Sequence, residues 1–173
     1  VASSFVVPTP KPVRTVHHAE TVMPRSFKLP GIFLTTGVAL DQLPFNGVIG
    51  PIVTALGILF LVQTLRLRFV FDDKTFFLQS GDDVGDNVVV GGENRWTYKS
   101  FVNYEVFPKD WLDAPQGPIL IYFKETQTPK DQWDKGPGQY AKGTPGQVHF
   151  FPALCDAPAI MNEFAKRGCK KVD

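Results

Sequence analysis

The stretch FLVQTLRLRFVF, residues 60–71, changes its periodicity halfway along. An unbroken apolar run ends just before Leu65, and residues 65–71 then alternate between two faces, as in a half-buried strand. Leu and Phe occupy one face, whereas Arg66 and Arg68 occupy the other. The pattern predicts that a helix ends here and that the first strand of a β domain follows directly.

The uncharged run before this strand covers residues 45–65. It holds roughly 21 residues, or about 31 Å of helix, which matches the hydrocarbon core of a bilayer. A second apolar segment, residues 31–40, reaches only about 15 Å as a helix and cannot span alone. A buried helix of a soluble core is the alternative, but such a helix rarely runs this long without a charge on any face. We therefore predict a membrane helical hairpin over residues 29–65.

Charge is divided unevenly along the 173 residues, although the formal net charge is only +1. Residues 1–71 carry six Lys/Arg and two acids, whereas residues 72–173 are slightly acidic. A nucleic-acid-binding protein would concentrate its basic residues on the folded domain, so that class is disfavoured. Lys28 before the hairpin and Arg66 and Arg68 after it are predicted to lie at the membrane interface. Because both ends are basic, the positive-inside rule places them on the cytoplasmic or stromal side.

Residues 1–28 show no periodicity and contain four prolines, which predicts an extended N-terminal arm. The first 19 residues have no acid and include several basic and small polar residues. We interpret this stretch as the remainder of a sequence processed during import into an organelle.

Downstream of the hairpin, residues 65–173 have the composition of a strand-rich domain. Residues 65–71 and 75–79 form a predicted β-hairpin around an Asp-Asp-Lys turn. Further strands are predicted at 88–90 and 95–107, and PILIYFKE, residues 118–125, is the predicted central strand.

The end of the chain predicts a closing helix. Strand 147–154 leads into a helix over residues 157–167, with Asp156 as its N-cap. We therefore predict an α+β membrane protein: a helical hairpin, then a small antiparallel sheet or pleckstrin-homology-like half-barrel, then a C-terminal helix. The likeness to pleckstrin-homology domains concerns element order only.

Residues 127–146 form a long segment with no regular period between two predicted strands. Such segments are either disordered or make a functional contact. Trp133 and Tyr140 within it, together with Trp111 in an earlier loop, favour contact with a partner protein.

Residues for catalysis do not converge in the sequence, so we expect the protein not to be an enzyme. His149 lies within a predicted strand and is interpreted as structural, and Cys155 and Cys169 as free thiols. We expect no metal, no small-molecule substrate and no intrinsic cofactor. Peripheral contact with chlorophyll, carotenoid or lipid is compatible with His17, Asn46 and Gln63.

Three stretches carry a resemblance to a known family: LRLRFVFDD (65–73) directly after the hairpin, ILIYFKE (119–125), and HFFPALCDAPAI (149–160) leading into MNEFAKRGC. They resemble an uncharacterised family of cyanobacterial and plastid membrane proteins with two short hydrophobic segments and a small β domain. The chain departs from the cyanobacterial pattern by apparent insertions at residues 80–94 and 127–146. It looks like an algal plastid member.

The resemblance implies a thylakoid membrane protein with its folded domain in the stroma of the chloroplast. We expect an accessory subunit of a photosynthetic complex, with photosystem I favoured, that contacts membrane and stromal subunits and thylakoid lipids. Two alternatives stay open. The protein could be a photosystem assembly factor that binds transiently, or a module that binds a lipid headgroup.

Overall fold

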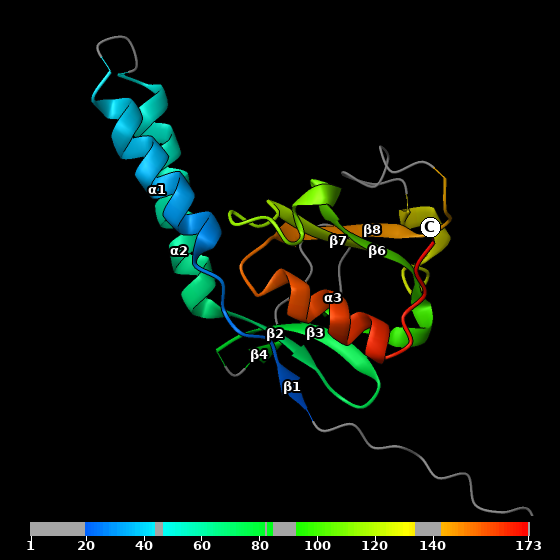
Figure 1. The fold of residues 1–173 in the computed structure, drawn as a ribbon. Coiled ribbons are helices and arrows are strands. Elements are labelled where there is room, and N and C mark those ends of the chain that lie inside the picture. The colour runs from blue at the N-terminus through cyan, green and yellow to red at the C-terminus, as the bar shows by residue number, and fades with distance from the viewer. Residues whose placement is uncertain (1–19, 44–46, 82, 85–92, 134–142, 173) are drawn as a thin grey trace, which may run out of the picture.

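The computed structural model describes residues 20–43, 47–81, 83–84, 93–133 and 143–172. The chain is α+β, with two antiparallel sheets and a C-terminal helix. Two helices project together from the β domain, and helix α3 lies across the two sheets (Figure 1). The predicted α+β class, antiparallel strands and C-terminal helix are therefore confirmed, and the two predicted apolar segments form a helical pair.

Helices α1 (Lys28–Asp41) and α2 (Ile49–Arg66) pack antiparallel along their length. Glycines make this close packing possible. A Cβ at Gly37 would lie 2.3 Å from the Thr54 hydroxyl, and a Cβ at Gly57 would lie 2.8 Å from the backbone nitrogen of Leu34. Small residues that let helix backbones approach are typical of helix pairs in membranes. Helix α2 runs two residues further than expected, so β2 begins at Leu67.

The first sheet is built on strand β3 (Thr75–Ser80). On one side it pairs with β2 (Leu67–Phe71), which in turn pairs with β1 (Thr21–Val22). On the other side β3 pairs with two short strands, β4 (Asp83–Val84) and β5 (Arg95–Thr97). The predicted turn between β2 and β3 is present, and the strand predicted at 88–90 lies outside the described residues.

The strand predicted over residues 95–107 is divided in the structure between the two sheets. Strand β5 ends at Thr97, a 3-10 turn η1 (Tyr98–Ser100) follows, and β6 (Phe101–Phe107) then enters the second sheet. The Tyr98 hydroxyl lies 2.6 Å from the carbonyl oxygens of Asp72 and Thr75. This bond holds the turn against the β2–β3 connection, a tertiary contact that residue periodicity does not report.

The second sheet has the order β6-β7-β8, with β7 (Leu120–Glu125) in the centre and β8 (Gln147–Pro152) beside it. Phe107 of β6 is opposite Leu120, and Phe101 is opposite Glu125. The predicted central strand is confirmed, and the two strands that flank residues 127–146 pair with each other. Two further 3-10 turns follow strands of this sheet, η2 (Lys109–Trp111) after β6 and η3 (Lys130–Gln132) after β7.

Helix α3 (Ala157–Lys166) joins the two sheets. Asp156 is its N-cap and accepts a hydrogen bond from the Ala159 backbone nitrogen at 2.8 Å, and Gly168 ends the turn after it at φ +74°. Phe164 of α3 is fully buried. Its ring contacts aromatic rings of both sheets, at centroid distances between 5.1 and 6.3 Å: Phe71, Phe76, Phe101, Tyr104 and Phe123.

Candidate functional site

Both chain connections between the helical pair and the β domain lie at the same end of the pair. Helix α2 continues directly into β2, and the segment before α1 is hydrogen-bonded to the segment before α3. The Ser26 nitrogen donates to the Leu154 oxygen, and the Asp156 nitrogen donates to the Pro24 oxygen, both at 2.9 Å. The base of the helical pair is therefore a defined junction.

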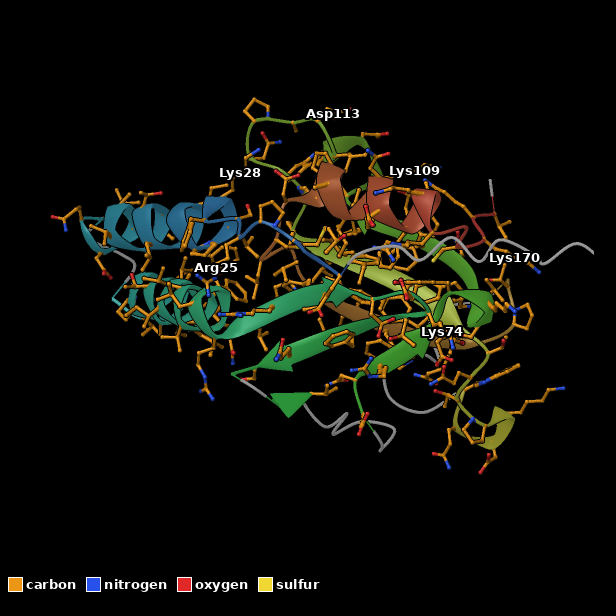
Figure 2. All side chains as sticks on the ribbon, turned by 90° about the horizontal axis from the view of Figure 1, so that it is seen from below. Arg25, Lys28, Lys74, Lys109, Asp113 and Lys170 are labelled. Atoms are coloured by element: carbon orange, nitrogen blue, oxygen red, sulfur yellow. The ribbon has the colours of Figure 1, made fainter. Side chains whose placement is uncertain are left out.

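Four cationic side chains meet at this junction: Arg25, Lys28, Arg66 and Arg68, which we call the basic collar. All four are exposed. Lys28, Arg66 and Arg68 come from α1, α2 and β2, and Arg25 comes from the segment before α1. Figure 2 shows Arg25 and Lys28 where the helices meet the β domain. The Arg25 guanidinium donates to the Leu65 carbonyl at 3.0 Å, which satisfies an oxygen in the last turn of α2.

The four collar cations share the absence of a counter-ion in the described part of the chain. Within the part of the chain that the structure describes, no carboxylate lies within 4.0 Å of a collar side chain. By contrast, Arg95 pairs with Asp72 and Arg167 with Glu163, each at 2.8 Å. The positive potential at the junction is therefore available to an external anion.

Two hollows open beside the collar. One has a volume of about 230 Å³ and lies between the segment of residues 22–25 and the start of β2, with Arg25, Arg68 and Cys155 among its lining residues. The other, of about 60 Å³, lies between Lys28 and the start of α3.

The outer faces of the helical pair are apolar. Most of the exposed large apolar side chains of the described residues belong to this pair or to the residues next to its far ends: Ile32, Val38, Leu43, Val48, Ile49, Ile52, Leu56, Ile58, Leu59, Val62 and Leu65. Only 17% of helix α2 is buried within the protein, whereas the core helix of a soluble protein is mostly buried. By length and composition, α2 is the one helix of the described residues that could cross a membrane.

A second polar cluster is buried at the far end of the β domain. The Glu125 carboxylate is inaccessible to solvent and lies 2.8 Å from His149 Nε2. It also accepts hydrogen bonds from the backbone nitrogens of Gln127 and Thr128 and from the Thr128 hydroxyl. Burial alone would raise the pKa of Glu125, but the hydrogen bonds from His149 and Thr128 outweigh burial and lower it.

This second cluster has a structural role that the geometry explains. Four donors occupy the Glu125 carboxylate, and the His149 ring stacks on Phe123 with centroids 5.1 Å apart. Neither of the two hollows beside the collar is lined by Glu125 or His149. The cluster fixes the chain where β7 ends and the long segment begins.

The predicted partner-contact tryptophans lie at opposite ends of the second sheet. Trp111 follows the end of β6 and is 37% exposed, whereas Trp133 follows the end of β7, and β6 and β7 are antiparallel. The Trp133 ring is half-buried and donates from Nε1 to the Thr128 oxygen at 2.7 Å. Tyr140 lies outside the described residues, as do His17 and Asn46.

The two thiols are not activated. Burial raises the pKa of Cys155, and it raises the pKa of Cys169 to about 12, although Arg167 opposes that shift. Across the described ranges, no group of three His, Cys, Asp or Glu side chains could hold a metal ion. The chemistry this junction offers is the binding of anions and of apolar surface.

The structure brings together the three predicted interface residues, Lys28, Arg66 and Arg68, and adds Arg25. The sequence gives Arg25 no evident role, because its hydrogen bond to the Leu65 carbonyl spans 40 residues. Sequence reasoning also missed the Glu125–His149 pair. The signal was present, since Glu125 and His149 fall in two of the three stretches that carry the family resemblance.

The family described as "Protein of unknown function (DUF3119)" matches residues 21–169, which covers both helices, both sheets and α3. Searches of curated proteins and of solved structures find no match. The expectation of an uncharacterised family is confirmed at this level, and the chain belongs to the DUF3119 family.

Proposed function

We propose that the protein is a membrane-anchored, non-catalytic accessory subunit, in which the α1–α2 pair inserts into a bilayer and the β domain lies on its surface. One observation carries this proposal: a helical pair with apolar outer faces ends at a collar of cations that have no counter-ion among the described residues. Apolar side chains favour hydrocarbon, and unpaired cations favour the headgroup region.

The dimensions support insertion. Helix α2 has 18 residues, or about 27 Å, which is close to the roughly 30 Å of a bilayer core. Helix α1 has 14 residues and is shorter, about 21 Å, so it would lie alongside α2 with its end at a shallower depth. Because the collar gathers both ends of the pair, the β domain would face the stroma in a plastid.

The photosynthetic part of the proposal rests on the resemblance of residues 65–73, 119–125 and 149–169 to plastid and cyanobacterial proteins. We propose the thylakoid membrane as the location and photosystem I as the favoured complex. Trp111 near the collar and Trp133 at the far end would then contact neighbouring subunits. We also propose, for the fold alone, the pleckstrin-homology-like arrangement of two sheets closed by a helix.

The test begins with membrane attachment. The tagged chain should resist extraction of thylakoids by alkaline carbonate, and Ile58→Lys should weaken this resistance, because a lysine near the centre of a spanning helix costs about 2.5–3.5 kcal/mol. Phe150→Lys is the matched control, since Phe150 is 46% exposed and Ile58 52%. Release of the unmodified chain into the carbonate wash would overturn the proposal.

Native gels of solubilised thylakoids then test which complex the protein belongs to. A permanent subunit co-migrates with the mature complex, in our proposal photosystem I. Co-migration only with immature complexes would identify an assembly factor instead, and migration as a free protein would exclude both.

A further inference from the structure

The larger hollow at the junction has the form of a binding site. Its volume of about 230 Å³ far exceeds the roughly 10–15 Å³ that one water molecule needs. Its lining comes from three separate segments: Val22, Met23 and Arg25, then Leu67, Arg68 and Phe69, then Cys155. Hydrogen bonds that join these segments, such as the one from the Met23 nitrogen to the Phe69 oxygen at 2.8 Å, fix their relative positions.

Two guanidinium groups contribute to the lining, and neither has a carboxylate partner in the described part of the chain. Arg25 is oriented by its bond to the Leu65 oxygen, made by one Nη, and its other N–H groups remain available. Arg68 is exposed on β2. Guanidinium groups present several donors in a plane, which suits the oxygens of a phosphate or sulfonate.

The other lining residues are apolar, and these apolar walls indicate which kind of anion would bind. Val22 is 50% exposed, and Met23, Leu67 and Phe69 add apolar atoms. A free inorganic anion gains nothing from such walls, whereas the glycerol and first methylenes of a lipid would cover them. The hollow also begins at the first residue after α2, at the level where the proposed span would leave the hydrocarbon core.

We propose that this hollow binds the headgroup of an anionic membrane lipid, with Arg25 and Arg68 holding the phosphate or sulfonate oxygens. The inference rests on the proposed membrane insertion of α1 and α2 and extends it, because it assigns a specific lipid site within the collar. Arg66 and Lys28 would attract anionic lipid without contacting the bound molecule, since neither lines this hollow.

The test uses the full chain in a neutral detergent, titrated separately with phosphatidylglycerol, phosphatidylcholine and inorganic phosphate, with bound lipid counted by native mass spectrometry. We expect one retained phosphatidylglycerol, no retained phosphatidylcholine and no competition from millimolar phosphate. Arg68→Gln should weaken phosphatidylglycerol binding about tenfold, the effect of losing one charge-assisted interaction. Competition by inorganic phosphate at that level would identify a simple anion site and overturn the lipid assignment.

The matched control is Arg66→Gln, which removes the same charge two residues away and should change binding less than about twofold. Arg68→Gln is preferred to an Arg25 variant, because Arg25 also holds the end of α2. Equal weakening of lipid binding by Arg66→Gln and Arg68→Gln would show that the lipid is held by general electrostatic attraction, and it would overturn the specific site. Unaltered binding in Arg68→Gln would reject the site, and an acidic segment of a neighbouring subunit would then be the remaining ligand for these arginines.

The two proposals can fail separately. If the chain resists carbonate but shows no preference for phosphatidylglycerol, the lipid site fails and membrane insertion stands. If carbonate releases the chain, insertion itself fails, whatever the detergent titration shows.

Discussion

The helical pair and the β domain distribute apolar and charged side chains in opposite ways. In the β domain, large aromatic residues point inward around Phe164, and its buried acid Glu125 is fully hydrogen-bonded. In the helical pair, Gly37 and Gly57 face the other helix, large aliphatic residues point outward, and the cations at the base have no carboxylate partner within the described ranges. Most buried side chains of the β domain are packed or hydrogen-bonded within it, with Gln147 Oε1 as an exception, whereas the outer faces of the helical pair are apolar and exposed.

The largest effect should come from the aromatic centre of the β domain. Phe164→Ala removes a ring that contacts five others and should lower the free energy of unfolding by about 3–5 kcal/mol. Tryptophan fluorescence in detergent provides the measurement, because buried Trp96 becomes exposed when this domain unfolds, and Trp111 and Trp133 belong to the same domain. Phe150→Ala is the control, because this residue is 46% exposed, and its effect should stay within about 0.5 kcal/mol. Equal losses of unfolding free energy in the two variants would mean that Phe164 of α3 does not lie at the centre of the core.

The next effect concerns the buried charge. Glu125→Gln replaces an acceptor of four hydrogen bonds with an amide whose NH₂ must face donors, and it should cost about 2–3 kcal/mol. Glu125→Asp keeps the charge but shortens the side chain, so it distinguishes the contribution of the charge to stability from that of side-chain length. A neutral result for the amide would show that the carboxylate is not needed to fix the end of β7.

The same variant should show a defined dependence on pH. Because the folded-state pKa of Glu125 is lowered from its ordinary value of 4.5, its contribution to stability is complete above that value. It is lost as the pH falls through the folded-state pKa. The stability difference between the unmodified chain and Glu125→Gln should therefore be constant from pH 7 to about pH 5 and shrink in more acidic buffer. A difference that grows on acidification would contradict this assignment.

A smaller effect is expected within the helical pair. Gly57→Ala places a Cβ 2.8 Å from the Leu34 backbone nitrogen, so the helices must separate, at about 1–3 kcal/mol. Circular dichroism follows the change, since α1 and α2 supply most of the helix, and Trp96 fluorescence should stay unaltered. Gly31→Ala is the control, because nothing lies within 4 Å of its added Cβ. A shift of the Trp96 transition would show that the two regions unfold together.

These two regions also differ in how far the sequence predicts them. The strand after α2, the central strand and the N-cap of α3 follow from local periodicity and side-chain chemistry. The structure has all three, although the first of them begins at Leu67 instead of Leu65. The division of residues 95–107 between two sheets does not follow, because it depends on the bond from Tyr98 to the β2–β3 turn. The sequence predicts that Lys28, Arg66 and Arg68 are charges at the ends of the helical pair. It does not predict that Arg25 joins them, because a contact across 40 residues leaves no periodic signal.

The smallest effect compares how the helices begin. The N-caps of α1 and α2 are Phe27 and Val48, which make no side-chain capping bond, whereas Asp156 caps α3. Asp156→Ala should therefore cost about 1 kcal/mol, and Asp156→Asn, which keeps an acceptor oxygen, less than about half of that.

Phe27→Asp and Val48→Asp provide the informative contrast. In water, an added capping carboxylate should stabilise each helix by a similar amount. In a bilayer the outcome should differ between the two sites, because Phe27 lies beside the collar whereas Val48 lies at the far end of the pair. Phe27→Asp should be tolerated at headgroup level, next to unpaired cations. Val48→Asp should weaken insertion if that end lies within the hydrocarbon core, and leave it unaltered if α2 crosses completely. The carbonate resistance of the two variants thus measures how deeply the helical pair extends.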